Sequence, residues 1–413
     1  MAEKTKVESR LLNSQKQQSV EDYFNQWRER IMAGDLGILP TILGLVVITI
    51  IFQSQNSNFL SPINFVNLMV QMAGLTVLAY GAVFVLLIGE IDLSVGYVSA
   101  VAAGAMVILS VPEPAGLGLP WYIALAGGLT VGLLIGIAHG LIITTFQLPA
   151  FVVTLAGFLF WNGVLLIILG NGGTIRLQDD FLRSFTRTFL PDIWGYIVAL
   201  LFIGGYTVVQ FYNRNIRTKR GLGVTPLAVV GLQIGILSLL SFGAVFYANQ
   251  NRGIPAIAVF VVFLLVVLTY VVDSTRYGRY LMAVGGNKEA ARRAGIPVEL
   301  IRTSVFAISG LMAAIGGMIL SIRLGSVSTS FEAGNLLLNA IAAAVIGGTS
   351  LFGGRGTIYS ALIGALIISA VDSGLGLLSL SSGVKFVVTG LVLLSAVVID
   401  SFSRRRQQQS GIA

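Results

Sequence analysis

Residues 65–89 read FVNLMVQMAGLTVLAYGAVFVLLIG, a run of 25 positions without a charged side chain. About 20 apolar residues in a helix are enough to cross the roughly 30 Å hydrocarbon core of a bilayer. Similar stretches recur along the whole chain, which is 55% hydrophobic and only 11% charged, whereas a soluble domain averages about 25% charged residues. The sequence therefore predicts an all-α, polytopic membrane protein.

Twelve apolar stretches can be drawn, and the 49 glycines suit membrane helices that pack closely. The stretch that begins at Leu93 follows the stretch 65–89 with almost no polar loop, so one of this pair can be broken or re-entrant. We expect about 10–12 transmembrane helices. The stretches lie at approximately 36–55, 65–89, 93–111, 120–145, 148–170, 192–213, 225–248, 254–273, 301–322, 334–352, 357–379 and 383–401.

Lysine and arginine concentrate in four segments, which together hold 19 of the 26 basic residues. These segments are 1–35, 214–220, 276–302 and 404–406. An even number of predicted spans separates each segment from the next, so all four can face the cytoplasm, where positive charge accumulates. We expect a multi-pass membrane protein with both ends in the cytoplasm. Basic residues in the cytoplasmic segments account for the net charge of +8, so no nucleic-acid partner is expected.

The expected organisation is a cytoplasmic N-terminal segment over 1–35, a membrane domain over 36–402 and a cytoplasmic tail over 403–413. The first 35 residues contain no short apolar core followed by a small-residue cleavage site, so a cleaved signal peptide is not expected. Five large side chains share one helical face and predict an amphipathic helix over 19–33 on the membrane surface, the alternative being a weakly ordered tail. They are Val20, Tyr23, Phe24, Trp27 and Ile31.

Two carboxylates, Glu90 and Asp92, lie between apolar runs. A charged residue near the bilayer centre costs about 2.5–3.5 kcal/mol on insertion scales and usually faces protein or a water-filled cavity. Asp92 and Ser94 can cap the helix expected to begin at Leu93, or they can line the translocation pathway. The two roles are compatible.

Four glycines recur every fourth residue in the stretch 120–145 and form one small-residue face: Gly128, Gly132, Gly136 and Gly140. This pattern predicts close packing against another helix. His139 is the single histidine and is expected to be a hydrogen-bonded structural residue. With no cysteine and one histidine, neither a metal site nor a set of catalytic residues is expected, and no cofactor is predicted.

Isolated polar residues interrupt three of the apolar stretches: Asn162, Asn339 and Asp372. Amide and carboxylate groups suit the hydroxyls of a sugar, so these side chains are candidates for a hydrophilic pathway. The competing interpretation is hydrogen bonding between helices, which membrane proteins use widely.

The polar segment 274–300 lies between two long apolar runs and contains Glu289-Ala-Ala-Arg-Arg-Ala-Gly295. Good helix formers from Asn287 to Arg293, followed by Gly295 and Pro297, predict a short helix in the cytoplasm. Its small residues, among them Ala290 and Ala291, are expected to dock on a partner. The chain has no Gly-x-x-x-x-Gly-Lys-Ser/Thr phosphate loop, so it is not expected to hydrolyse nucleotide itself.

A weak internal similarity joins two distant segments. Ile88-Gly89-x-x-x-Leu93-x-x-Gly96 recurs as Ile346-Gly347-x-x-x-Leu351-x-x-Gly354. Transporters often carry internal repeats that meet at the substrate pathway, although Gly- and Leu-rich helices can also match by chance.

Several motifs resemble a known family. Glu289-Ala290-Ala291-x-x-x-Gly295 is similar to the EAA loop of ABC importer permeases. Four further segments resemble the ribose, xylose, galactose and arabinose permeases of bacterial binding-protein-dependent importers, over about 64–400. Glu90, where many relatives have Gly, and the extra apolar pair at 192–250 are similar to the xylose branch. The four segments are 90–96, 149–157, 283–287 and 340–351.

The resemblance implies a transmembrane permease subunit of an ATP-driven importer of xylose or a related monosaccharide. It also implies a separate cytoplasmic ATPase, a periplasmic sugar-binding protein and a second permease copy in the lipid bilayer. Glu289, Ala290, Ala291 and Gly295 are then the residues expected to couple to the ATPase. Asn339 stands where the family commonly has Asp, so it brings no charge to that position.

Two other readings stay open from the sequence. An ion-coupled secondary sugar transporter would need a paired intramembrane carboxylate or a cation relay, for which Asp92 and Asp372 are the candidates. A scaffold or receptor component without a transport role is the other alternative.

Overall fold

The structure is a computed structural model that describes residues 39–170, 173–329, 333–381 and 386–391, with a few further positions near both ends of the chain. The predicted amphipathic helix over 19–33 lies for the most part outside the described residues, and the tail 403–413 lies wholly outside them. The chain divides into two compact units. The main unit comprises Gly37–Phe189 and Pro255–Asp400, and the segment Leu190–Ile254 belongs to the other.

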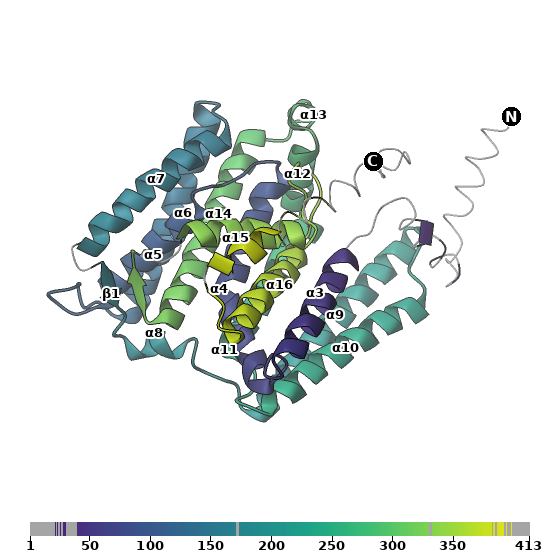
Figure 1. Ribbon diagram of the computed structural model, residues 1–413. Helices are drawn as coiled ribbons and strands as arrows, with labels where there is room; N and C mark the ends of the chain where they lie inside the picture. The colour runs from purple at the N-terminus through teal and green to yellow at the C-terminus, as the bar shows by residue number, and fades with distance from the viewer. Residues whose placement is uncertain are drawn as a thin grey trace. The chain divides into compact units, whose positions relative to one another are not determined.

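Helices make up nearly all of the main unit, and Figure 1 shows their arrangement within it. A short α8 (Asp180–Ser184) and the strands β1 (Thr174–Arg176) and β2 (Ser326–Ser328) complete it. The helices are α3 (Leu39–Gln55), α4 (Pro62–Leu87), α5 (Val95–Ser110), α6 (Trp121–Thr145), α7 (Ala150–Leu169), α11 (Ala256–Ser274), α12 (Arg276–Gly286), α13 (Lys288–Arg293), α14 (Val298–Leu324), α15 (Ala333–Ile346) and α16 (Ile358–Leu377).

The other unit is a pair of helices, α9 (Asp192–Lys219) and α10 (Leu227–Asn249). The prediction ended the first of these at 213, but α9 continues for six residues to Lys219. Its last turns therefore carry basic side chains that the sequence analysis assigned to a link between helices. Arginine and lysine are good helix formers, and basic residues interact favourably with the C-terminal end of a helix.

Eight helices within the described residues are long and apolar enough to cross a membrane, and they include both helices of the smaller unit. Three further apolar helices, α3, α5 and α15, are shorter. The prediction of an all-α polytopic membrane protein is confirmed. Eleven of the twelve predicted stretches correspond to helices, and the described positions of the twelfth, 383–401, are helical as well.

Two of the short helices are interruptions of the membrane-spanning pattern. With 16 residues in α5 and 14 in α15, at about 1.5 Å per residue, they extend about 24 and 21 Å, less than the roughly 30 Å core. The prediction started the helix at Leu93, but α5 begins at Val95 after a turn. The sequence analysis also predicted a single apolar stretch over 334–352, whereas the helix α15 ends at Ile346. Gly348 there has a φ of +107°, which a helix does not accommodate.

The centre of the main unit is α14, which packs against α4, α5 and α6. Glycine permits the close approach: a Cβ atom at Gly132 would lie 2.6 Å from the Gly310 carbonyl oxygen. All four glycines of the predicted stripe are buried on α6. Gly132, Gly136 and Gly140 face the backbone of α14, and Gly128 faces both α5 and α14. The small-residue face of α6 is thus a contact surface with α14.

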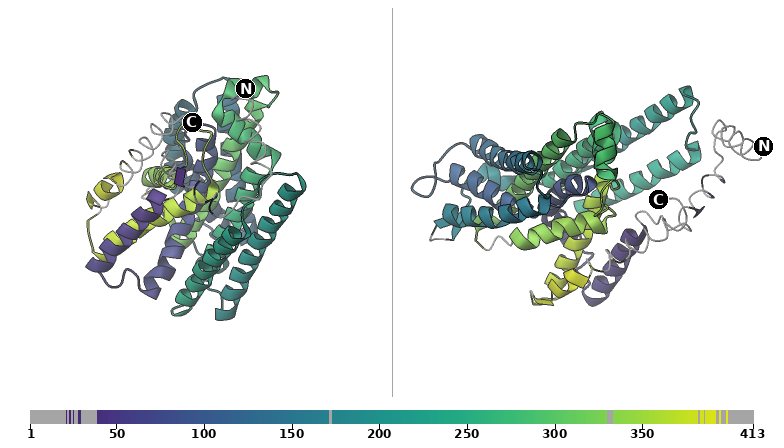
Figure 2. Two further views of the ribbon diagram at one scale, coloured as in Figure 1. Left: turned by 90° about the vertical axis from the view of Figure 1, so that its right-hand side faces the viewer. Right: turned by 90° about the horizontal axis from the view of Figure 1, so that it is seen from above.

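A second, smaller hydrophobic cluster joins α3 to α16. Phe52 stacks on Phe59 with ring centroids 5.3 Å apart, and both belong to one buried cluster with residues of α16 such as Val371. Figure 2 shows the two helices side by side in its left-hand view. The hydroxyl of Thr41 also donates to the carbonyl of Ile346 at 2.8 Å, which ties the start of α3 to the end of α15.

The two ends of the main unit differ in character. At one end stand α12 and α13, and at the other lie α8 and the β1–β2 pair, as Figure 1 shows. The strands pair antiparallel, with Thr174 opposite Ser328. They connect the segment after α7 to the segment after α14.

We expect Gly310→Ala to lower the free energy of unfolding, because the new methyl group would overlap the backbone of α6. Overpacking of this kind typically costs about 1–3 kcal/mol. Thermal denaturation of the detergent-purified protein measures the loss. Gly163→Ala on α7 is the matched control, because no atom lies within 4 Å of its Cβ position. Equal denaturation temperatures for the two variants would contradict the packing argument.

Candidate functional site

The short helix α13 forms where the sequence predicted it. Asn287 is its N-cap, and the Asn287 Oδ1 atom accepts a hydrogen bond from the backbone N–H of Ala290 at 2.9 Å. Gly295 follows the helix with a φ of +80°, a conformation that favours glycine over every other residue. Capping at one end and a left-handed glycine at the other fix the length of α13 at six residues.

The exposed face of α13 differs from the predicted one at one position. Glu289 and Ala290 are exposed, but Ala291 is buried with 4% of its surface accessible. Residues 290 and 291 are about 100° apart on a helix of 3.6 residues per turn, so a helix lying on the protein cannot expose both equally. Ala291 therefore packs α13 onto the bundle, and the surface that a partner can reach contains Glu289 and Ala290.

Ion pairs order the exposed surface around α13. Arg292 binds Glu289 at 2.8 Å and Glu299, in the first turn of α14, at 2.7 Å. The hydrogen bond to Glu299, together with the charge of Glu289, raises the pKa of the Arg292 guanidinium. Exposed pairs contribute little to stability. Their effect here is to hold the side chain of Glu289 in one orientation.

The sequence analysis missed the helix α12, which precedes α13 and is capped by the hydroxyl of Thr275. Tyr277 of α12 donates a hydrogen bond to the hydroxyl of Ser304 in α14 over 2.9 Å, since the Ser304 hydroxyl itself donates to Ile301. Burial raises the pKa of Tyr277, so this phenol stays protonated and able to donate. The polar segment before α13 is thus a helix anchored to α14.

Two glycine-containing turns meet the end of α12. The backbone N–H of Gly354 donates to the carbonyl of Leu87 at 2.9 Å, and a Cβ atom at Gly285 would overlap that same carbonyl. A Cβ atom at Gly89 would lie 3.2 Å from the carbonyl oxygen of Phe352. The two segments with similar sequence, 88–96 and 346–354, are therefore in direct contact beside the end of α12.

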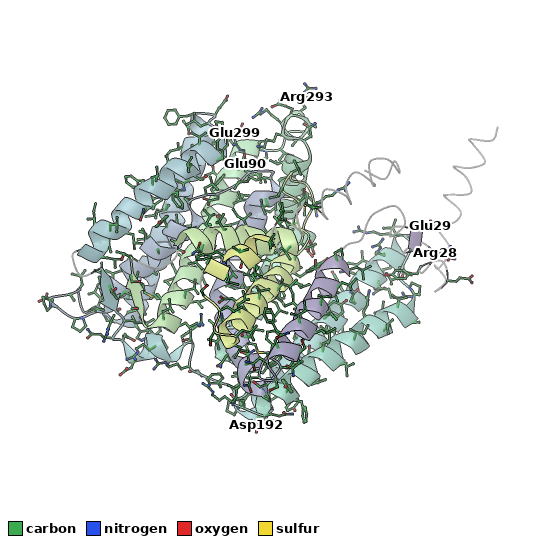
Figure 3. The ribbon with its side chains drawn as sticks, in the orientation of Figure 1. Arg28, Glu29, Glu90, Asp192, Arg293 and Glu299 are labelled. Carbon is green, nitrogen blue, oxygen red and sulfur yellow. The ribbon has the colours of Figure 1, made fainter. Side chains whose placement is uncertain are left out.

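The turn between α4 and α5 carries a buried ion cluster. Glu90 has a side chain only 5% exposed, and its Oε1 atom accepts from Lys288 Nζ at 2.7 Å and from Arg302 Nη2 at 2.6 Å. Lys288 is the first residue of α13, and Arg302 lies in α14. Figure 3 shows Glu90 inside the bundle, at the same end as Arg293 and Glu299. This cluster joins α13 and α14 to the turn.

Two residues farther along, Asp92 is the centre of a second buried network. Its Oδ1 atom accepts from the backbone N–H of Ser94 at 2.9 Å and from the Ser94 hydroxyl at 2.6 Å. Its Oδ2 atom accepts from the hydroxyl of Ser309 in α14 at 2.9 Å. The hydrogen bonds of Asp92 thus stabilise the turn and reach α14, but the Asp92 carboxylate does not cap the free N–H groups inside α5.

His139 extends this network across two more helices. Trp161 Nε1 of α7 donates to His139 Nε2 at 3.1 Å, and His139 Nδ1 lies 3.3 Å from the Ser94 hydroxyl. Because that hydroxyl donates to Asp92, His139 Nδ1 must be the donor in its contact with Ser94. A neutral imidazole protonated at Nδ1 satisfies both contacts. His139 is a structural link within the protein, as the sequence predicted.

The other predicted pathway residues lie apart from this network. Asn162 is half-buried on α7, and Asn339 is half-buried on α15. Asp372 is exposed on α16, where its Oδ2 atom accepts a hydrogen bond from Gln71 of α4 at 2.8 Å. Of the five candidates, the structure joins Asp92 directly to Ser94. No group of three or more potential metal ligands occurs within the described residues.

The functional residues that the sequence analysis missed are the partners of the two carboxylates. The position of Arg302 could have indicated a buried acidic partner, because this arginine lies inside the predicted apolar stretch 301–322. Ser309 and Trp161 gave no such signal, since serine and tryptophan are ordinary residues in membrane helices.

We expect Ser309→Ala to lower the free energy of unfolding by about 1.5–3 kcal/mol, the value of a hydrogen bond to a charged group. The measurement is thermal denaturation of the purified protein. Ser321→Ala is the matched control on the same helix, because among the described residues its buried hydroxyl bonds only the carbonyl of Met318 one turn away. If Ser321→Ala lowered the free energy of unfolding as much as Ser309→Ala, the hydrogen bond to Asp92 would add no stability beyond that of an ordinary buried hydroxyl.

Comparison with known proteins identifies relatives over most of the chain. Residues 64–397 match the family described as "Branched-chain amino acid transport system / permease component". The xylose transport system permease protein of Escherichia coli (strain K12) is 37% identical over 375 residues, which cover 90% of this chain and 93% of the relative. No solved structure shows a significant match.

Two further relatives have the same full-length coverage. The xylose transport system permease protein of Haemophilus influenzae is 34% identical, over 91% of this chain and 99% of the relative. The ribose import permease protein of Bacillus subtilis is 33% identical, over 88% and 92%. These matches include both the turn with Glu90 and Asp92 and the segment that forms α13. The chain belongs to this family of transport-system permease components and is a multi-pass membrane permease.

Proposed function

We propose that this chain is the permease subunit of an ATP-driven importer of xylose or a related monosaccharide. The observation that carries the proposal is α13, a capped helix that exposes Glu289 and Ala290 at the basic end of the main unit. The relatives named as xylose and ribose permeases supply the substrate class. The sequence has no phosphate-binding loop, and in this proposal a separate ATPase subunit supplies the energy.

In this proposal α13 is the surface on which the ATPase docks. Glu289 and Ala290 form the contact, Ala291 packs the helix onto the bundle, and Gly295 ends it. The concentration of basic residues at 276–302 favours a cytoplasmic position for this surface, with both chain ends on the same side. A periplasmic sugar-binding protein then delivers substrate at the opposite end, near α8.

The interrupted helices favour a substrate pathway beside α5 and α15. Short, broken helices in corresponding parts of a transporter commonly border the pathway. Gly96 at the start of α5 is packed against Ala333 at the start of α15. A small cavity next to them is bordered by Asp92, Ser309 and Ile341. Asp92 with Ser94 is therefore the polar pair that we assign to the pathway, and Asn162, Asn339 and Asp372 are secondary candidates.

A second copy of the permease completes the proposed assembly, with each copy receiving one ATPase subunit. The ion-coupled alternative receives less support, because it needs carboxylates that act together. Asp92 is bound by two serines at the turn before α5, whereas Asp372 is exposed on α16 and bound to Gln71. These two carboxylates therefore have separate hydrogen-bond partners.

Uptake of labelled xylose by cells that express this chain with its ATPase and binding protein tests the function. We expect uptake to be lost when the chain or the ATPase is deleted and to persist when an uncoupler dissipates the ion gradient while ATP is maintained. Unlabelled ribose and arabinose, added as competitors, define the sugar. Uptake that survives loss of the ATPase but collapses with the uncoupler would support the ion-coupled alternative.

We expect Glu289→Lys to abolish most uptake without changing the amount of permease in the membrane, because it reverses the charge of an exposed docking residue and breaks the pair with Arg292. Co-purification of the ATPase and sugar uptake are measured together. Glu29→Lys, the same charge reversal at an exposed residue outside the polar segment 274–300, is the control. Normal ATPase association and uptake in Glu289→Lys would refute the docking role.

A further inference from the structure

The ion cluster at Glu90 connects α13 to the turn that leads into α5. Lys288 reaches Glu90 from the first residue of α13, 198 positions away in the sequence. Lys288 and Arg302 share the Oε1 atom, which Arg302 contacts through both Nε and Nη2. One carboxylate oxygen thus holds a short helix and a long helix to one turn.

The same turn continues directly into the Asp92 network. Only Ile91 separates the two carboxylates, and Asp92 contacts Ser309 of α14 and, through Ser94 and His139, reaches α6 and α7. A displacement of Glu90 therefore displaces the residue that organises the polar contacts of four elements. Because the chain spans at most about 3.3–3.6 Å per residue, a large shift of the backbone at Glu90 moves the backbone at Asp92 as well.

The two carboxylate oxygens of Glu90 are used unequally, which leaves room for the ion pairs to rearrange. Oε1 accepts from both cations, whereas Oε2 is buried and has no hydrogen-bond partner within the part of the chain that the structure describes. Glu90 also borders the small cavity that contains Asp92 and Ser309. A carboxylate can bind two cations either on one oxygen or on both. A second arrangement, in which one cation binds Oε2, would therefore leave no buried charge without a partner.

We propose that Glu90, Lys288 and Arg302 form a latch that transmits movement of α13 to the turn before α5. In the arrangement observed, both cations share Oε1. When α13 shifts, Lys288 draws the carboxylate with it and Arg302 moves to Oε2. An element with two discrete arrangements is the physical requirement for coupling between distant sites. The inference rests on the proposed function, because it takes α13 as the surface that the ATPase moves.

Lys288→Met is the decisive variant. It disconnects α13 from the turn while Glu90 keeps Arg302 as a partner, and Lys288 is itself 40% exposed, so the folded permease is retained. We expect the purified complex with ATPase and binding protein, reconstituted in vesicles, to hydrolyse ATP at a rate within about twofold of the unmodified complex. The amount of xylose imported per ATP is expected to fall at least tenfold. The matched control is Lys219→Met, which replaces an exposed lysine of α9. We expect this control to leave import per ATP unchanged.

Glu90→Gln and the double variant Glu90→Gln/Lys288→Met complete the test. If the two residues act as one latch, the double variant is no worse in import per ATP than the poorer single variant. The proposal would be overturned if the double variant lost import per ATP by the product of the two single losses. It would also be overturned if Lys288→Met left import per ATP unchanged. Reduced assembly of the complex with normal import per ATP in Lys288→Met would show a purely structural role and overturn it as well. Failure of the unmodified complex to import with ATP would instead refute the proposed function.

Discussion

Direct contact between helix backbones at glycine is the constraint on which the rest of the main unit depends. In a bilayer the lipid tails are as apolar as leucine, so helices gain little from hydrophobic burial and rely on close packing. A Cβ atom at Gly316 would lie 2.7 Å from the carbonyl of Gly74, and one at Gly132 would lie 2.6 Å from that of Gly310. These contacts bring α14 against α4 and α6 together. Only this approach lets Ser309 and Arg302 of α14 reach the turn between α4 and α5.

The two buried carboxylates of that turn, Glu90 and Asp92, bind different kinds of partner. Glu90 meets two cations that belong to α13 and α14, and it lies at the end of the unit that contains α13. Asp92 meets the hydroxyl groups of Ser94 and Ser309. The Ser94 hydroxyl in turn contacts His139 of α6, which accepts a hydrogen bond from Trp161 of α7. Burying a charge is costly unless it is paired or hydrogen-bonded, so each carboxylate holds its partners in place. The turn is therefore fixed from the ends of several helices at once.

The membership of the permease family and the observed geometry bear on different questions. The relatives, at 33–37% identity over most of the chain, establish what class of protein this is. They do not say how the short helix α13 is connected to the interior of the bundle. The contacts of Lys288, Glu90 and Asp92 supply a continuous physical route between the two. This is why the turn 88–94, rather than α13 alone, is the centre of the proposed mechanism.

The sequence by itself determined the membrane class, the positions of most helices and the short helix that ends at Gly295. Each follows from local properties: long apolar runs, the capping residue Asn287 and a glycine in a left-handed conformation. The sequence also singled out the glycine stripe of α6, because a four-residue period is visible without a partner. Only the tertiary structure decided that Ala291 faces inward, that Glu90 binds Lys288 and Arg302, and that 88–96 meets 346–354. Those facts depend on contacts between residues up to about 260 positions apart, and no local pattern encodes which distant side chain completes a buried charge.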